Sequence, residues 1–377
     1  MKIAILGTRG IPNRYGGFEA FAEQLSARLA EHGHDVRVYC RRPFSRPGDE
    51  KLIDPRVRRV ILPSIATKHL DTAINTFIAA LHVAFTDADA VLMCNVGNSA
   101  VAWIPRLFGK PVVLNVDGLD RQRRKWGALA RTYLHFNEWL SNFTPTRVVT
   151  DSRAIQDYYR QRYRRESAMI GYGAAVPAAH NPDGDSVLQR FNLQSKRYIL
   201  YVSRLEPENH PDLVIRAYQR MKTAWPLVMV GDSRYDPAYA ERLRAQSSQS
   251  KGGPGVIFTG AIYGPGYWEL QRHAGVFVFA CEVGGIHPAL IETMAAGNAS
   301  LFLDTESNRE TAGDCGVVFS RDEAEAGADL AAKLESLIAD PARRAQLGAA
   351  ARLRAQQLYN WDDITGKYEA LLAEVAR

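Results

Sequence analysis

Apolar residues in the first half of the chain occur in short runs that alternate with longer amphipathic stretches. Six runs rich in Val, Ile and Leu have the length and composition of buried strands: residues 2–6, 35–40, 57–62, 90–94, 111–116 and 147–150. Between the first two runs, residues 18–31 place their apolar side chains at the spacing of one helix face. Strands that alternate with helices in this way predict a parallel sheet with helices on both sides.

The second half repeats the pattern after a segment that resembles a linker. Residues 174–186, AAVPAAHNPDGDS, are rich in Pro, Gly and Asp, and strand-like runs follow at 198–204, 226–232, 255–260, 275–281 and 299–304. A length of 377 residues is also too great for one ordinary core. We therefore predict an α/β protein with two doubly wound, Rossmann-like domains, residues 1–174 and 175–360. A final amphipathic helix, 361–377, is expected to pack back on the first domain.

Composition narrows the class of protein. Hydrophobic residues make up 46% and charged residues 23%, as in soluble globular proteins. The four cysteines form no Cys-x-x-Cys pair, which argues against a thiolate zinc site or a disulfide framework and favours a reducing cytosol. The opening MKIAILGTRG reads as a first strand rather than a signal peptide, and no run approaches the ~18 apolar residues of a membrane span. A cytoplasmic protein is expected.

The net charge of +6 is distributed unevenly along the chain. Residues 1–174 carry 26 Lys and Arg against 16 Asp and Glu, whereas the remainder carries 21 against 25. The clusters RQRRKW (121–126) and RQRYRR (160–165) supply much of this basic excess. It predicts contact with an anionic surface such as a membrane, although a solvated basic face is an equal alternative. Nucleic acid is not the expected partner, because no recognised binding motif accompanies the charge.

The segment LGTRGIPNRYGGFE, residues 6–19, joins the first strand to the first helix through four glycines. A dinucleotide-binding fingerprint requires Gly-x-Gly-x-x-Gly and an acidic residue about 20 positions further on. The glycines here are spaced differently, and the second strand ends in Cys40-Arg41-Arg42 without a carboxylate. A hydride-transfer enzyme therefore becomes a minor hypothesis.

The same loop still brings Gly16 and Gly17 to a helix N-terminus, where free backbone N–H groups favour an anion. Arg9 and Arg14 lie in the same loop. We expect a phosphate or sugar contact here; the alternative is a tight turn that only needs a positive φ.

The segment CEVGGIHPALIETMAAGN, residues 281–298, leaves a buried strand, crosses two glycines and enters a helix. Pro288 at the helix start and Gly297 at its end suit those positions. Glu292, one turn into the helix, can accept two ribose hydroxyls while loop amides face a pyrophosphate. Its alternative role is simple complementarity to the helix dipole.

This segment resembles the donor-site motif of retaining GT-B glycosyltransferases of glycosyltransferase family 4, in which two glutamates eight positions apart bracket a glycine loop that holds a nucleotide sugar. VSRLEPEN (202–209), VGD (230–232), FTG (258–260) and SNRE (307–310) agree with it. RGIPNRYGGFE, LNVDGLDRQRRKWG (114–127) and TDSRAIQDYY (150–159) resemble a narrower, rhamnosyltransferase-like branch of bacterial polysaccharide synthesis. The resemblance covers essentially the whole chain and implies two domains facing a central cleft.

The resemblance assigns roles to individual residues on the donor side. Glu292 matches the second glutamate, which contacts ribose, and Arg204 matches the arginine that neutralises the donor pyrophosphate. The loop whose amides reach phosphate and sugar corresponds to Gly284, Gly285, Ile286 and His287. Two positions depart from the motif: glycine replaces the first glutamate at 284, with Glu282 two residues earlier, and Asn209 replaces the usual pyrophosphate lysine.

On the acceptor side, the resemblance places Gly16 and Gly17 at the reaction centre. Asp117 lies where many members have a His-Asp pair near the transferred sugar, although a simple turn is its alternative. The residues expected to face the acceptor or the membrane are Arg9, Arg123, Arg124 and Lys125.

No metal and no cofactor are expected. Asp87 and Asp89 form an Asp-x-Asp pattern, which some glycosyltransferases use for a metal, but they precede the strand at 90–94 and so lie away from a ligand crevice. Asp183 and Asp185 fall in the linker. The histidines show no metal-binding pairing.

These features together predict a retaining, metal-independent glycosyltransferase. It would move a hexosyl or deoxyhexosyl group from a nucleotide diphosphate sugar to a lipid-linked saccharide, at the inner face of the cell membrane, in cell-surface polysaccharide synthesis. The leading donor is dTDP-rhamnose; a UDP- or GDP-hexose (glucose or mannose) is the alternative. A sugar-nucleotide epimerase or phosphorylase and a catalytically silent nucleotide-sugar-binding protein also remain open.

Overall fold

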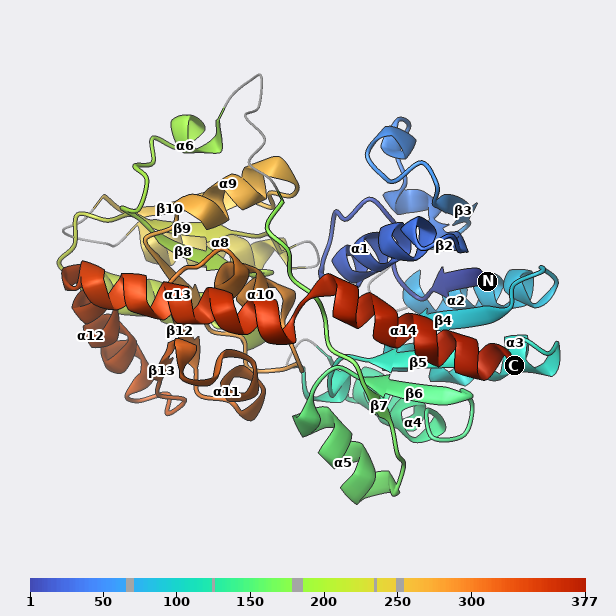
Figure 1. Ribbon diagram of the computed structural model, residues 1–377. Coiled ribbons are helices and arrows are strands. Elements are labelled where there is room, and N and C mark those ends of the chain that lie inside the picture. The colour runs from blue at the N-terminus through green and yellow to red at the C-terminus, as the bar shows by residue number, and fades with distance from the viewer. Residues whose placement is uncertain (66–70, 124–125, 178–185, 234–235, 249–253) are drawn as a thin grey trace. The chain divides into compact units, whose positions relative to one another are not determined.

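The computed structural model describes residues 1–65, 71–123, 126–177, 186–233, 236–248 and 254–377. Contacts between Cα atoms divide the chain into two compact units (Figure 1). Unit 1 comprises Met1–Gly173 together with Trp361–Arg377, and unit 2 comprises Ala174–Asn360. The boundary falls one residue before the expected one, and the last helix belongs to unit 1.

Unit 1 contains a seven-stranded parallel sheet with the order β3-β2-β1-β4-β5-β6-β7. The central strands are apolar on both faces, as the strands of a covered parallel sheet must be. The strands are β1 (Lys2–Leu6), β2 (Asp35–Arg41), β3 (Arg58–Leu62), β4 (Ala90–Cys94), β5 (Val112–Val116), β6 (Arg147–Thr150) and β7 (Ala168–Met169).

Helices cover both faces of this sheet. From β1 to β2 the chain moves one way along the sheet, and from β3 through β4 to β7 it moves the other way. Because parallel crossovers are right-handed, the connecting helices of the two directions lie on opposite faces. The helices are α1 (Gly17–Glu31), α2 (Asp71–Ala84), α3 (Trp103–Leu107), α4 (Ala128–Leu140), α5 (Arg153–Tyr163) and α14 (Trp361–Ala376), with short 3-10 turns η1 (Arg42–Phe44), η2 (Asp49–Lys51), η3 (Val96–Val101) and η4 (Asp120–Gln122).

Helix α14 packs against α1 and β4 within unit 1, as Figure 1 shows. The Tyr368 ring lies 5.2 Å from the ring of Phe21 on α1, and the Asn115 amide on β5 donates to the Tyr368 hydroxyl. A methyl group on Gly173 would come within 2.4 Å of the Trp361 ring, so the chain needs a glycine where it passes beneath α14. Aromatic burial and a polar contact to the sheet therefore hold the C-terminal helix on the first unit.

Unit 2 contains a six-stranded parallel sheet with the order β10-β9-β8-β11-β12-β13. Apolar residues of its strands pack with apolar residues of α7, α8 and α12 in one hydrophobic core cluster. The strands are β8 (Ile199–Val202), β9 (Leu227–Val230), β10 (Val256–Gly260), β11 (Val276–Phe279), β12 (Ser300–Leu303) and β13 (Val317–Phe319).

The helices of unit 2 begin mostly at prolines or at capping side chains. Asp236, Thr305 and Asp340 each accept a backbone N–H in the first turn of the helix that follows. The helices are α6 (Val187–Arg190), α7 (Pro211–Arg220), α8 (Pro237–Ser247), α9 (Pro265–His273), α10 (Pro288–Ala295), α11 (Glu306–Ala312), α12 (Ala326–Ala339) and α13 (Pro341–Leu358), with the 3-10 turns η5 (Pro207–Asn209) and η6 (Gly313–Cys315).

Candidate active site

The strand order of unit 2 reverses between β8 and β11. In open α/β sheets, ligands bind outside the carboxyl ends of the strands at such a reversal. Arg204 follows β8, and the loop 281–287 follows β11 and leads into α10. The structure therefore brings the predicted donor residues to the one edge of this sheet where a ligand crevice is expected.

Arg204 is held by a turn that Asn209 braces. The Asn209 side-chain amide donates to the Arg204 carbonyl oxygen at 2.8 Å, and the Asn209 carbonyl accepts the Tyr201 hydroxyl at 2.7 Å. Asn209 is buried, whereas the Arg204 side chain is 30% exposed and pairs with Glu206 at 3.5 Å. These contacts make Asn209 a positioning residue for Arg204; its direct contact with the donor stays a prediction.

Glu282 is bound by a histidine and an arginine and so does not take the place of the missing first glutamate. Its carboxylate lies 3.2 Å from His210 Nε2 and 2.7 Å from the Arg321 guanidinium. Its backbone N–H donates to the Glu208 carbonyl at 3.0 Å. Glu282 therefore fastens the loop after β11 to the loop after β8, with both loops at the strand reversal.

Gly284 and His287 depend on each other. Gly284 has a φ of +150°, and a methyl group built on it would come within 2.5 Å of the His287 ring. That ring also packs against Phe279, with centroids 5.0 Å apart. His287 is the N-cap residue of α10, but its side chain makes no capping hydrogen bond to that helix. The imidazole instead fills the space beside position 284.

Glu292 lies on α10 and is bound by a residue that sequence analysis missed. The Tyr267 hydroxyl on α9 donates to Glu292 Oε2 at 2.5 Å, and the buried Gln271 donates to the Tyr267 oxygen at 2.8 Å. Burial raises the pKa of Glu292, and the bond from Tyr267 opposes that rise. Burial also raises the pKa of Tyr267 well above its usual value, so its hydroxyl keeps its proton. Because one oxygen is occupied, Glu292 Oε1 is the oxygen available to a ligand hydroxyl.

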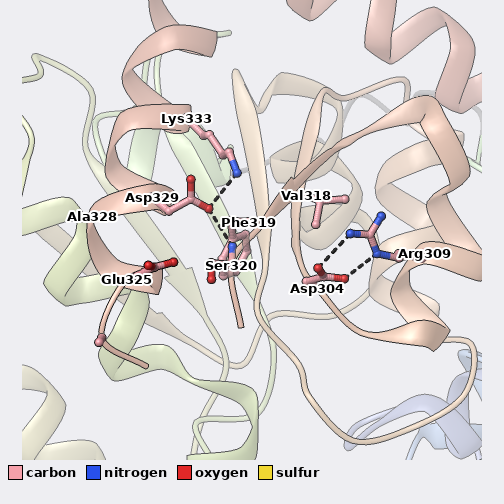
Figure 2. Close-up of a pocket in the computed structure, with 10 residues that line it drawn as sticks. Asp304, Arg309, Val318, Phe319, Ser320, Glu325, Ala328, Asp329 and Lys333 are labelled. Carbon is pink, nitrogen blue, oxygen red and sulfur yellow. Dashed lines mark hydrogen bonds and ion pairs between the residues drawn. The ribbon is translucent and has the colours of Figure 1, made fainter. Parts of the chain in front are cut away.

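A separate pocket of about 720 Å³ lies further along the same sheet, around the ends of β12 and β13. Figure 2 shows two ion pairs in it: Asp304 binds Arg309, and Asp329 binds Lys333 and the Ser320 backbone N–H, while Glu325 lines the pocket as a further carboxylate. Neither Arg204 nor Glu292 lines this pocket. Because it lies at β12 and β13 rather than at the reversal between β8 and β11, we do not assign the donor to it.

Unit 1 has its own strand reversal, between β1 and β4, and the glycine loop lies there. Gly16 is the N-cap of α1 and Gly17 is its first residue, as expected. The loop folds onto acidic side chains of α1: Glu19 accepts the Arg9 backbone N–H at 2.8 Å, and Glu23 accepts the Asn13 backbone N–H. The backbone N–H groups of Arg9 and Asn13 in this loop thus bind side chains of the protein itself.

Arg9 is part of this loop's internal structure. Its guanidinium lies 3.6 Å from the centroid of the Tyr15 ring, 3.7 Å from the Asp71 carboxylate and 4.0 Å from Glu19. The side chain is only 17% exposed. Arg9 therefore neutralises buried carboxylates, and its expected place on the acceptor or membrane side stays a prediction.

Arg123 is also an internal residue. Its side chain is 10% exposed and donates to Asp120 at 2.7 Å, and Asp120 accepts the Asn95 amide at 2.9 Å. Arg121 of the same cluster pairs with the buried Glu138 at 3.0 Å. Arg123 is thus paired within the protein, and its expected place on the acceptor or membrane side stays a prediction. The predicted Arg124 and Lys125 lie outside the described residues.

Asp117 follows β5 at the carboxyl edge of the unit 1 sheet and is partly exposed. Burial, and to a smaller degree the Asp117 charge, raise the pKa of Cys94 at the end of β4. The Asp117 carboxylate therefore lies near the strand reversal. This is where we expect the transferred sugar.

The Asp-x-Asp pattern lies in a loop, as expected. Asp87 pairs with Lys2 and Arg37, and Asp89 accepts the Lys2 backbone N–H. Within the described ranges, no group of three His, Cys, Asp or Glu side chains is placed to hold a metal ion. Among the same residues, no helix has the length and apolar character needed to cross a membrane.

Two family models divide the chain almost as the two units do. Residues 188–354 match glycosyl transferases group 1, and residues 1–175 match a domain of unknown function, DUF1972. The first of these models carries the donor-site segment. The chain is a glycosyltransferase of the GT-B fold.

Relatives agree along the whole chain. The GDP-mannose-dependent alpha-(1-6)-phosphatidylinositol monomannoside mannosyltransferase of Mycolicibacterium smegmatis is 25% identical over 391 aligned residues, covering 95% of this chain and 94% of that protein. Sucrose-phosphate synthase from Thermosynechococcus elongatus superposes with a TM-score of 0.83 at 21% identity, over 99% and 98% of the two chains. Anabaena HepE in complex with UDP-glucose superposes with a TM-score of 0.79 at 16% identity, over 99% and 100%.

Proposed function

We propose that this glycosyltransferase moves a hexosyl or deoxyhexosyl group from a nucleotide diphosphate sugar to a saccharide on a lipid carrier, with retention of configuration. The observation that carries the donor assignment is the placement of Arg204 and Glu292 around one strand reversal, joined by the glycine loop. The names of the relatives support a nucleotide-sugar donor, since one uses GDP-mannose and another was solved with UDP-glucose.

Each donor-side residue has a distinct role in this proposal. Glu292 Oε1 accepts a ribose hydroxyl, while Tyr267 fixes the orientation of the carboxylate. Arg204 and the N-terminus of α10 offset the negative charge that develops on the departing diphosphate. The family resemblance implies that the acceptor attacks the sugar from the same face that the diphosphate leaves. This attack retains the configuration, and no side chain needs to form a covalent bond to the sugar.

The sugar is the less constrained part of the donor. Position 284 carries no carboxylate, and the His287 imidazole occupies the adjacent space. A ring nitrogen at that place offers one hydrogen bond to a sugar hydroxyl where a carboxylate would offer several. This favours a sugar with fewer hydroxyls to satisfy, such as rhamnose from dTDP-rhamnose; the names of the relatives favour mannose or glucose instead.

The lipid-linked acceptor is proposed from two sources. The relative from Mycolicibacterium smegmatis acts on a phosphatidylinositol glycolipid, and residues 1–174 carry a basic excess that suits an anionic membrane. On this basis we place the enzyme on the cytoplasmic face of the cell membrane, in polysaccharide synthesis.

The deciding experiment is a calorimetric screen of the purified protein against dTDP, UDP and GDP, followed by a hydrolysis assay with the matching nucleotide sugars. We expect one nucleotide to bind most tightly and its sugar to be released slowly in the absence of acceptor. Binding without any hydrolysis or transfer would favour the catalytically silent alternative. Failure of all three to bind would remove the donor site altogether.

Metal independence is a prediction of its own. Because Arg204 and α10 supply the positive charge, treatment with EDTA is expected to leave donor hydrolysis unchanged. The measurement is the hydrolysis rate before and after EDTA, with manganese or magnesium added back. A rate that is lost with EDTA and restored by either ion would overturn this part of the proposal.

A further inference from the structure

Exposed apolar side chains are concentrated on one helical layer of unit 1. Of the large hydrophobic residues with high exposure, most lie on α2, α3 and α4 or directly after them. Three are almost fully exposed: Leu129 at 87%, Phe85 at 75% and Leu107 at 73%. We call the set the apolar face: Phe77, Leu81, Phe85, Trp103, Leu107, Phe108, Leu129, Tyr133, Phe136, Trp139 and Phe143.

The apolar face is continuous from helix to helix. The rings of Phe85 and Phe108 lie 4.8 Å apart, joining the end of α2 to the end of α3. The Arg106 guanidinium donates to the Phe143 and Thr144 carbonyl oxygens at 3.0 and 2.7 Å, joining α3 to the end of α4. Trp139 and Phe143 are 5.0 Å apart. Soluble monomers rarely expose so many adjoining apolar groups unless the surface binds a partner.

The charges on this layer are all of one sign at the surface. Helices α2, α3 and α4 contain two carboxylates, Asp71 and Glu138, and both are buried and bound to arginines. The exposed ionic residues include Arg131 in the first turn of α4 and Arg106 on α3. An anionic partner would therefore meet no exposed carboxylate on these three helices.

Arg106 adjoins the end of the apolar face, because its guanidinium donates to the Phe143 and Thr144 carbonyl oxygens. Burial lowers the pKa of Arg165, and the charges of Arg147 and Arg106 lower it further. Arg147 itself is paired with Glu374 of α14 at 2.8 Å. The exposed arginines of the three helices, Arg106 and Arg131, are therefore the cations that this face presents.

We propose that the apolar face rests on an anionic lipid bilayer, with its aromatic rings in the headgroup region and the exposed arginines Arg106 and Arg131 against lipid phosphates. Aromatic and cationic side chains are the residues that stabilise helices lying in the plane of a membrane surface. The proposal rests on the proposed function only for the location of the acceptor in a membrane. The proposed membrane contact is the outer surface of α2–α4 rather than the RQRRKW cluster. In that cluster, Arg121 and Arg123 are paired with carboxylates of the protein itself.

A second copy of the chain is the competing occupant, and the charges oppose it. A two-fold dimer would place this face against itself. Arginines would then meet arginines with no exposed carboxylate on α2, α3 or α4 to pair with them, and such like-charge contacts are unfavourable. A lipid surface supplies the missing negative charge.

The test is sedimentation of the full-length protein with vesicles of phosphatidylcholine, alone or mixed with phosphatidylglycerol. The apolar variant Phe136→Ser/Trp139→Ser/Phe143→Ser is expected to lose binding to mixed vesicles by at least about tenfold, since burial of three aromatic rings is removed. The basic variant Arg131→Gln should bind mixed vesicles about fivefold less, and raised salt should also weaken the binding of wild type. The matched control, Leu353→Ser/Leu358→Ser, removes comparably exposed apolar residues from α13 of unit 2 and should bind like wild type.

Nucleotide binding and thermal unfolding are measured on every variant. Both should match wild type, because the replaced side chains are exposed and lie outside unit 2. Equal vesicle binding by wild type and the apolar variant overturns the inference, as does a wild-type dimer that becomes monomeric in the apolar variant without any vesicle binding. If nucleotide binding persists while vesicle binding fails, the proposed function stands and only this inference falls.

Discussion

Glu292→Ala is expected to weaken binding of the donor nucleotide by roughly tenfold to a hundredfold. Removing a carboxylate that accepts a ribose hydroxyl loses a charge-assisted hydrogen bond, which contributes about 1.5–3 kcal/mol. Isothermal titration of the nucleotide selected in the screen gives the dissociation constant directly. The fold should survive, since burial raises the pKa of Glu292 and its charge is therefore no source of stability.

The pH dependence of binding gives a second test of the same residue. The ionised carboxylate is the form that accepts hydroxyl groups, and the Glu292 pKa is raised. Binding should therefore be strong above that pKa and weaken as the pH falls through it, at a pH higher than an ordinary glutamate would show. In Glu292→Gln this step should be absent.

Tyr267→Phe is the matched control. Its hydroxyl opposes the rise of the Glu292 pKa, so its loss should shift the step to higher pH while leaving most of the affinity at alkaline pH. Equal dissociation constants for wild type and Glu292→Ala, at every pH, would contradict the assignment of Glu292 to the donor site.

Periodicity predicted the strands well because buried parallel strands are apolar along their whole length. The expected runs at 2–6, 90–94 and 147–150 coincide with β1, β4 and β6. Strands β7 and β13 were missed, since they comprise only Ala168–Met169 and Val317–Phe319. Two or three residues are too few to show an alternation or an apolar run.

The donor motif could be located from sequence because its parts are close together along the chain. Gly284, His287 and Glu292 share one strand-to-helix connection, and Pro288 marks the helix start. Tyr267, by contrast, reaches Glu292 from a different helix, and Arg321 reaches Glu282 from beyond β13. A hydrogen bond between distant segments leaves no spacing that sequence analysis can detect.

Counting charges along the chain likewise does not show which arginines are exposed. Arg9 and Arg123 add to the basic excess of the first half, yet each is paired in the interior with a carboxylate, Asp71 and Asp120 respectively. Only tertiary structure distinguishes such an arginine from a solvated one. Sequence analysis missed the exposed aromatic residues of α4, because apolar residues at helical spacing normally form the buried face of a helix.

Tyr368→Ala is expected to destabilise unit 1 by about 3–5 kcal/mol, the usual result of truncating a fully buried aromatic residue. The ring packs on Phe21, and the hydroxyl accepts the Asn115 amide of β5. For a unit of this size, each kcal/mol lowers the melting temperature by roughly 2–4 °C. Differential scanning calorimetry should therefore show a transition lowered by on the order of 10 °C.

Two further substitutions on α14 make the effect specific. Tyr368→Phe keeps the ring but leaves the buried Asn115 amide without its acceptor, so it should cost about 1–3 kcal/mol. Lys367→Ala changes the exposed neighbour and should unfold like wild type. Below the transition, all three variants should bind nucleotide normally, because Arg204 and Glu292 lie in unit 2. If Tyr368→Ala and Lys367→Ala have the same melting temperature, then α14 contributes nothing to the stability of unit 1. If Tyr368→Ala melts lowest, Tyr368→Phe next and Lys367→Ala like wild type, then α14 is part of the core of unit 1.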